Sequence, residues 1–424
     1  MTKKAKGRLR LLVSMLALVV LLSSCGGGGS KSEKVDGGKV TLQFWTIALQ
    51  PTFTPYFNRV IADYEQKNPN VKIDWKDYPY DAVTNKLLTS IASNSSPDVV
   101  NLNTEFASQM GSKGAVVDMN EHLSPEEKAA YFEGIYNSTV INGKAYALPW
   151  YTGTEVLYMN TKLVKAAGLD PAHPPKTREE LSEWGRQINR KIGKAGYAQQ
   201  LVSKLFAVDG IPILNKEKTA AAFNTPEAVT MIDNLKKQME DGVVLKEDAD
   251  FSQQVKYYAG EQVAFELAGP TFINFIKTAA PDVYKNTIAV PVPTGKADVR
   301  LSNSMDLVVP AKSAHVDEAV KFAVFLTNAE SQTAFSKAAN TLPSTKDSIK
   351  DPYFTQSDKS LEAQAKVASA QSLDKATDYM VGVPNAKDVN SAVARALQNI
   401  VLNGTDTKQT LTALEQEVND ILKQ

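Results

Sequence analysis

Aromatic rings and neutral or acidic hydrogen-bonding groups stand where strand-like runs of this sequence end. Trp45 and Thr46 end one run, and Asn103 and Glu105 follow another. Further members of the same set, at turns and loops later in the chain, are Trp150, Tyr151, Asn303 and Tyr379. Aromatic faces suit the apolar C–H face of a pyranose, whereas amide and carboxylate oxygens accept hydrogen bonds from its hydroxyls. The set predicts a pocket for an uncharged, polyhydroxylated ligand.

Catalytic chemistry finds less support in these residues. Serine or cysteine catalysis requires a paired histidine, and the histidines, His122, His173 and His315, lie in loops or helix starts beside no nucleophile motif. A glycoside hydrolase needs two carboxylates about 5 to 10 Å apart. The candidates are Glu105, Glu155, Glu266 and Asp306. Nothing marks two of them as a pair, so a surface carbohydrate-active enzyme is the less favoured alternative.

Metals, cofactors and anionic ligands are also disfavoured. Histidine is too scarce for a transition-metal cage, and Lys246–Asp250 lacks the glycine and the final glutamate of a calcium loop. We therefore expect no metal and no cofactor. A phosphate receptor would need a glycine-rich helix start or clustered arginines, which are missing among the proposed pocket residues. A binding protein for another polar solute, such as a glycerol phosphate, stays open as an alternative.

The N-terminus has the composition of an export signal. Basic residues in Lys3–Arg10 precede Leu11–Leu22, an apolar run shorter than the roughly 20 residues of a membrane span. Small residues then lead to Cys25, the one cysteine of the chain, and a glycine-rich stretch typical of a flexible tether follows. The arrangement at Cys25 resembles the lipobox of bacterial lipoproteins. That resemblance implies a signal peptide over residues 1–24, acylation of Cys25, and a tether over residues 25–39.

Charge and length set further limits. The whole chain carries +0, and the five basic residues of the signal leave the mature body near −5 without a basic face. Nucleic acid is therefore excluded as a partner, because its recognition needs a footprint rich in lysine and arginine. A mature chain of this length suggests two lobes rather than one small core.

Alternating strand and helix patterns organise the first part of the mature chain. Strand-like runs at Val40–Trp45, Val71–Trp75 and Pro97–Leu102 alternate with helical stripes over Phe53–Tyr64 and Val83–Ile91. This βαβαβ order predicts a mainly parallel sheet with right-handed crossovers. Ligands of such sheets lie beyond the carboxyl ends of the strands, where Trp45, Thr46, Asn103 and Glu105 stand.

The remaining elements are mostly helical. A strand is expected at Val263–Leu267, and Leu201–Ala222 is too irregular for an assignment. Helices are expected at Leu181–Ile192, Val229–Met239, Phe251–Tyr258, Ala314–Phe325, Leu361–Ser372, Val389–Leu402 and Thr410–Leu422. Thr177 and Glu180 form a capping box before the first of these.

The stretch Ile141–Leu181 carries the most specific signal. It contains a hairpin turn at Asn142-Gly143, then Leu148-Pro149, Leu157-Tyr158, Asn160, and a proline-rich segment before the capping box. In this order it resembles the extracellular solute-binding proteins of carbohydrate ABC importers, the family of the maltose-binding protein. The resemblance implies an α/β, two-lobe periplasmic-binding-protein-like fold, each lobe a mainly parallel sheet flanked by helices, joined by a multi-crossing hinge. The implied first lobe is 40–150 with 308–355, and the second is 151–307 with 356–424.

The same resemblance implies ligand contacts. The family often has a tryptophan and a carboxylate at the places of Trp45 and Glu105. The segment before Gly269 lacks the family's following tryptophan, for which Phe272 is the expected substitute. Further implied positions are Asn303 and Met305 in the second hinge crossing, and Asn340 before the third.

The resemblance also implies a role and a place. The protein would capture a sugar between its lobes and deliver it to the two transmembrane subunits of a permease. It would be a monomeric lipoprotein on the outer face of the cytoplasmic membrane, or in the periplasm, and it would not be an enzyme.

Overall fold

The computed structural model describes residues 39–379 and 382–423. The predicted signal peptide and the acylated Cys25 lie outside the described residues. Among the residues described, no helix is long and apolar enough to cross a membrane.

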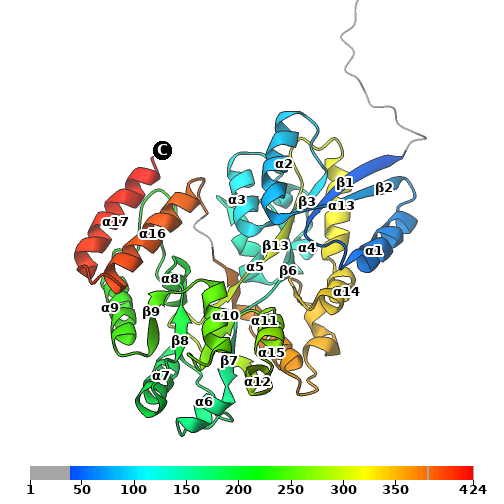
Figure 1. Ribbon diagram of the computed structural model, residues 1–424. Coiled ribbons are helices and arrows are strands. Elements are labelled where there is room, and N and C mark those ends of the chain that lie inside the picture. The colour runs from blue at the N-terminus through cyan, green and yellow to red at the C-terminus, as the bar shows by residue number, and fades with distance from the viewer. Residues whose placement is uncertain (1–38, 380–381, 424) are drawn as a thin grey trace, which may run out of the picture. The chain divides into compact units, whose positions relative to one another are not determined.

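A six-stranded sheet organises the first lobe, the name used here for the elements packed on it (Figure 1). Its order is β14-β6-β13-β3-β1-β2. The strands are β1 (Val40–Ile47), β2 (Val71–Tyr78), β3 (Val99–Asn103), β6 (Leu148–Thr152), β13 (Met305–Val308) and β14 (Leu342–Pro343). β1 runs parallel to β2 and β3, which confirms the predicted βαβαβ unit. The helices of this lobe are α1 (Thr54–Lys67), α2 (Tyr80–Ala92), α3 (Thr104–Ser112), α4 (Pro125–Ala129), α5 (Glu133–Ser138), α13 (Val316–Thr327) and α14 (Ala329–Ala339).

The other half of this sheet is antiparallel, which corrects the expectation of a mainly parallel sheet. β13 pairs antiparallel with β3 and β6, and β14 pairs antiparallel with β6. The reason is the chain path: β6 leaves the lobe and β13 returns to it, so neighbouring strands run in opposite directions.

Both faces of the sheet are covered, because successive side chains of a strand point to opposite sides. Phe44 of β1 joins a core with Phe57 of α1 and Phe322 of α13. Trp45, one residue later, joins a separate core on the other face with Val83 and Leu87 of α2.

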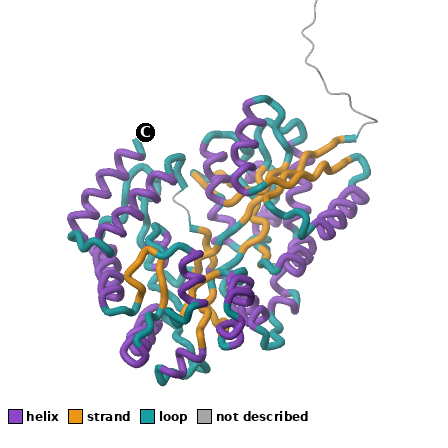
Figure 2. Tube along the Cα trace, viewed as in Figure 1, coloured by secondary structure: helices purple, strands orange, loops and turns teal. Residues whose placement is uncertain are grey.

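A second group of elements, called the second lobe, packs on the three-stranded sheet β10-β7-β11. Its strands are β7 (Val156–Asn160), β10 (Phe265–Ala268) and β11 (Thr287–Pro291), with a parallel pair β8 (Tyr197–Gln199) and β9 (Val244–Asp248) beside them. Figure 2 shows these strands between the helices that cover them. Those helices are α6 (Thr161–Ala166), α7 (Arg178–Ile192), α8 (Lys204–Val208), α9 (Pro226–Glu240), α10 (Phe251–Ala259), α11 (Phe272–Ala279), α12 (Pro281–Lys285), α15 (Leu361–Ala370), α16 (Ala386–Val401) and α17 (Thr407–Ile421).

The expectation of a mainly parallel sheet is wrong for the strands around β7. Both β10 and β11 pair antiparallel with β7. β10 and β11 point the same way and are joined through α11 and α12, as parallel strands are. However, β7 enters from the first lobe and inserts between them in the opposite direction.

Local signals in the sequence reappear as local structure. Asn142 and Gly143 both have positive φ, 52° and 79°, in the turn between β4 (Val140–Ile141) and β5 (Lys144–Ala145). The capping box of α7 is present: Thr177 Oγ1 accepts from Glu180 N at 3.1 Å, and Glu180 Oε2 accepts from Thr177 N at 3.4 Å.

Two crossing segments between the lobes lie side by side. Thr154 and Ser302 form an antiparallel bridge, and Asn303 N donates to Gly153 O at 3.0 Å. Thr154 is also tied to α15, since its Oγ1 donates to Ser369 O at 2.9 Å in a buried position. This paired crossing has the build of a hinge, in which a few residues at element ends absorb rotation.

Candidate functional site

Asp378 lies at the junction of the two lobes. It ends β15 (Ala376–Asp378), which pairs in parallel with β12 (Arg300–Ser302) next to the hinge. Thr104 Oγ1, at the start of α3, donates to Asp378 Oδ2 at 2.6 Å, and Ser304 N donates to the same oxygen at 2.9 Å. A Cβ on Gly134 would lie 2.2 Å from Ala376 O, so only glycine lets α5 approach β15 this closely.

A second carboxyl group, Asp306 of β13, is fully buried near the first. Neither of its oxygens has a hydrogen-bond partner among the described residues. Burial, and then the charge of Asp378, raises the pKa of Asp306 well above its ordinary value, against a smaller opposing effect of Thr104. Burial therefore favours the protonated form of Asp306.

Asp378 itself titrates close to neutrality. Burial raises its pKa to about 6, while the bonds from Thr104 and Ser304 oppose the rise. The charge of Glu105 adds to the rise, and the ammonium of Lys204 opposes it. Lys204 belongs to α8 of the second lobe, so charges of both lobes act on this carboxylate.

Lys204 also acts on a carboxyl pair of the second lobe. Its Nζ lies 3.2 Å from Glu155 Oε1 at the start of β7. Glu266 of β10 is 1% exposed, and burial together with the charge of Glu155 raises its pKa to about 8, with Lys204 opposing. Glu266 and the ion pair of Glu155 with Lys204 thus form a polar cluster in the second lobe.

Tyr379 lies between two hollows that have walls from both lobes. In one, Glu105 and Ser108 of α3 face Tyr379 and the α16 residues Ala386 and Asn390. Burial raises the pKa of the Tyr379 phenol, with the Ser203 hydroxyl opposing, yet its oxygen has no partner of hydrogen-bond geometry among the residues described.

The second hollow lies on the other side of Tyr379. It is bounded by Gly134, Asn137 and Ser138 of α5 and by Lys218 of the second lobe. Lys218 Nζ donates to Gly382 O at 3.2 Å, and burial lowers the pKa of this lysine. The two hollows and the groups around Asp378 form what we call the interlobe site.

Several residues proposed from the sequence lie at this site. Glu105 and Tyr379 line one hollow. Met305 is the register partner of Asn103 on one side and of Tyr151 on the other, so these three form a row across the edge of the sheet. The exposed Asn303 lies beside Gly153 in the hinge crossing.

Trp45, Thr46 and Trp150 do not offer a surface to a ligand, and their proposed role is corrected. Trp150 has zero exposure and stacks on Phe335, with ring centroids 5.1 Å apart and 15° between the planes. Trp45 is 4% exposed within the core under α2. β1 runs on to Ile47, so Trp45 is inside the strand and not beyond its end.

The hydroxyl of Thr46 forms its hydrogen bonds within the first lobe. Its Oγ1 donates to Asp77 Oδ1 at 2.6 Å and accepts from Trp75 Nε1 at 2.8 Å, with the residue at zero exposure. Its partners fix the two strands β1 and β2 together. Thr46 is therefore a structural residue of the sheet.

Three further positions proposed from the sequence differ in their exposure. Phe272, the expected substitute aromatic, is fully buried against Tyr158 and Tyr258 and faces no hollow. Asn340 ends α14 in the left-handed region, with φ 55°, and is exposed. Gly269 lies open, with nothing within 4 Å of a Cβ built on it, and its carbonyl accepts from Tyr158.

Sequence reasoning missed the charged residues that bind this site together. Lys204 and Lys218 lie in the stretch Leu201–Ala222, which showed no regular pattern, and Asp378 lies in a separate segment far along the chain. Their approach depends on the hinge crossing, which spacing along the chain does not reveal. In the described ranges, no group of three or more His, Cys, Asp or Glu side chains is placed to hold a metal ion.

The family of the chain follows from its sequence. Residues 50–333 match the bacterial extracellular solute-binding protein family. The chain belongs to this family. It is 23% identical to the multiple sugar-binding protein of Streptococcus mutans, over 74% of this chain and 77% of that protein.

Two further similar proteins extend the comparison. The arabinooligosaccharide-binding protein of Bacillus subtilis is 24% identical, over 75% of this chain and 76% of its own length. The crystal structure of the cyclic alpha-maltosyl-1,6-maltose binding protein from Arthrobacter globiformis aligns with a TM-score of 0.78, covering 91% of this chain and all of that one, at 22% identity. The two-lobe fold of the solute-binding family is thus shared.

Proposed function

We propose that this extracellular solute-binding protein captures a carbohydrate between its lobes and delivers it unaltered to the permease of an ABC importer. The observation that carries the proposal is the interlobe site, where hollows on both sides of Tyr379 have walls from both lobes. A ligand bound there contacts both lobes at once, and only such a ligand favours closure. The sugar-binding relatives support carbohydrate as the ligand class.

The chemistry of the site favours a neutral ligand with several hydroxyls. Glu105 is exposed toward the hollow, and a carboxylate accepts more than one hydroxyl hydrogen bond. The partly exposed ring of Tyr379 gives a flat surface for a sugar face. Asp378 adds a second carboxyl group beside Glu105, which disfavours a glycerol phosphate or another anion.

The site binds and does not cleave in this proposal. Thr104 Oγ1 and Ser304 N both donate to Asp378 Oδ2, and Asp306 is fully buried, so we assign these two carboxyl groups a structural role. Their role is to hold the crossing segments together. Closing and opening of the lobes then involves rotation at Thr152–Val156 and Ser302–Met305.

The cellular setting is part of the same proposal. Export through the signal peptide and acylation of Cys25 would tether the body to the outer face of the membrane, near its permease. We also propose a monomer, with lobe limits as predicted from the sequence.

Thermal shift with a panel of mono-, di- and oligosaccharides, glycerol phosphates and amino acids tests the ligand class. Hits are then titrated by calorimetry with the wild type, Glu105→Gln, and a matched control, Glu126→Gln, an exposed carboxylate in the first turn of α4. We expect a saccharide hit that Glu105→Gln weakens and Glu126→Gln leaves unchanged. The proposal fails if no saccharide stabilises the protein, or if the hit is consumed.

A further inference from the structure

A groove in the second lobe has its own set of ligand-binding groups. It lies between α7, α8, α9 and the loop after β11, and encloses about 300 Å³. Its cations are Arg178, Arg186, Lys237 and Lys296, and its acids are Glu179 and Asp209. We call it the α7–α9 groove. It shares no lining residue with the hollows of the interlobe site.

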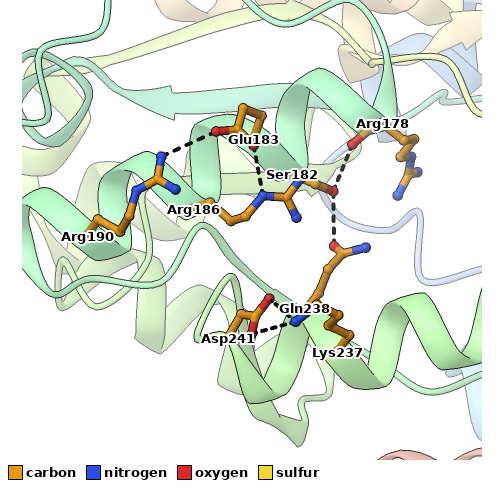
Figure 3. Close-up of polar contacts among 8 residues, drawn as sticks. All are labelled: Arg178, Ser182, Glu183, Arg186, Arg190, Lys237, Gln238 and Asp241. Carbon is orange, nitrogen blue, oxygen red and sulfur yellow. Dashed lines mark hydrogen bonds and ion pairs between the residues drawn. The ribbon is translucent and has the colours of Figure 1, made fainter.

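Two of the four cations are already neutralised by acids outside the groove. Arg186 Nε lies 2.8 Å from Glu183 Oε2, and Lys237 Nζ lies 3.0 Å from Asp241 Oδ2, as Figure 3 shows. Arg178 and Lys296 form no ion pair within the described part of the chain. The Nε of Arg178 is in addition buried without any hydrogen-bond partner there. A buried guanidinium donor without an acceptor is costly, and a ligand acceptor would remove that cost.

The fold holds Arg178 and the loop of Lys296 in fixed positions. Arg178 N donates to Thr294 O at 2.9 Å, and Ala297 N donates to Val208 O at 3.1 Å, so the loop is tied on both sides of Lys296. A Cβ on Gly295 would lie 2.4 Å from Val208 O, which shows how tightly the loop packs on α8.

A neutral donor is oriented toward the same space. Gln238 Oε1 accepts from the Tyr197 hydroxyl at 3.2 Å and lies 3.0 Å from Ser182 Oγ. Its amide nitrogen is thereby turned away from these residues, toward the side where Arg178 lies in Figure 3. Ser182 and Tyr197 are both buried, which fixes this orientation.

The rest of the lining defines the body of the ligand. Apolar side chains from two helices, α8 and α9, complete the walls: Leu205, Val208, Met231 and Leu235. Glu179 and Asp209 repel a multiply charged anion. We propose that the α7–α9 groove binds a small monocarboxylate with an apolar body, its carboxylate on Arg178 and its body on these side chains. Arg suits a carboxylate because its fork of N–H groups matches the two oxygens.

Benzoate is a suitable probe, with benzamide as its neutral counterpart and inorganic phosphate as a non-carboxylate anion. Methionine methyl groups labelled with ¹³C report on each place separately, since Met231 lines the groove and Met305 lies at the hinge. We expect benzoate to shift the Met231 signal with a Kd of about 1 mM, which corresponds to about −4 kcal/mol. Benzamide and phosphate should leave it in place, and the Met305 signal should respond to the saccharide and not to benzoate.

Variants test whether Arg178 binds the carboxylate of benzoate. Arg178→Gln should weaken benzoate at least tenfold, while Arg190→Gln, on the same helix but outside the groove, should not change it. Lys296→Gln, in the exposed loop, should weaken benzoate severalfold and guards against a folding defect in the first variant. Sugar binding should stay unchanged in all three, so failure here is distinct from failure of the proposed function. The inference is overturned if Met231 does not respond to benzoate, if benzamide acts equally, or if Arg178→Gln binds benzoate as the wild type does.

Discussion

Replacing Trp150 by alanine separates a structural role from a ligand-binding role. The indole has zero exposure, stacks on Phe335, and contacts Phe44 and Phe57 edge-on, with centroids 6.1 and 5.9 Å from its own. Truncating a buried tryptophan costs about 3 to 5 kcal/mol. Its Nε1 has no hydrogen-bond partner in the described residues, so removing it recovers about 1 kcal/mol.

The expected loss for Trp150→Ala is therefore about 2 to 4 kcal/mol of unfolding free energy. Trp150→Phe keeps an aromatic ring and removes the unpaired N–H, so it should cost less than half as much. Urea unfolding, extrapolated linearly to water, measures both values.

The sugar affinity of the folded fraction completes the test. We expect both variants to bind the saccharide like the wild type when measured well below their unfolding transitions. If Trp150→Ala keeps full stability but loses the sugar, the ring faces the ligand, and its placement in the core is refuted.

Three further predictions concern the carboxyl groups. Glu105→Gln should lower the affinity for the saccharide by about tenfold to a hundredfold, because hydrogen bonds to a charged group contribute about 1.5 to 3 kcal/mol. Calorimetry measures this affinity, and an unchanged value would show that Glu105 is not part of the site. Burial raises the pKa of Glu266 to about 8, so the protonated side chain is favoured in the folded state. The resulting contribution to folding stability is fully present below pH 4 and is lost as the pH rises to 8. Glu266→Gln should thus raise stability at pH 8 by about 1 to 3 kcal/mol relative to its effect at pH 4, and equal effects at both pH values would contradict the assignment. Thr104→Val removes a bond to charged Asp378 and should move its pKa above about 6, followed by carboxyl ¹³C NMR; an unchanged or lower value would contradict the contact.

The local signals in the sequence were reliable because they depend on neighbours in the chain. The capping box at Thr177 and Glu180, the turn at Asn142-Gly143 and the βαβαβ unit are all settled within a few tens of residues. The direction of the strands around β7 could not be predicted in this way, because it depends on how the chain crosses between the lobes.

The site was partly predictable for the same reason. Glu105 could be identified because it follows a strand end, and Tyr379 because it lies in an aromatic loop. Trp45 and Trp150 shared those local features, but whether a strand-end ring meets a ligand or a helix is decided by distant segments such as α2 and α14. The contact of Thr104 with Asp378, 274 positions apart in sequence, has no local signature.

Calorimetric titration of the mature protein with the saccharide found by thermal shift, followed by analysis of the recovered ligand, tests the central claim most directly. We predict one sugar per protein, a Kd of about 1 μM, equivalent to about −8 kcal/mol, and recovery of the intact saccharide. Absence of binding by every saccharide, or recovery of a cleaved product, would contradict the claim.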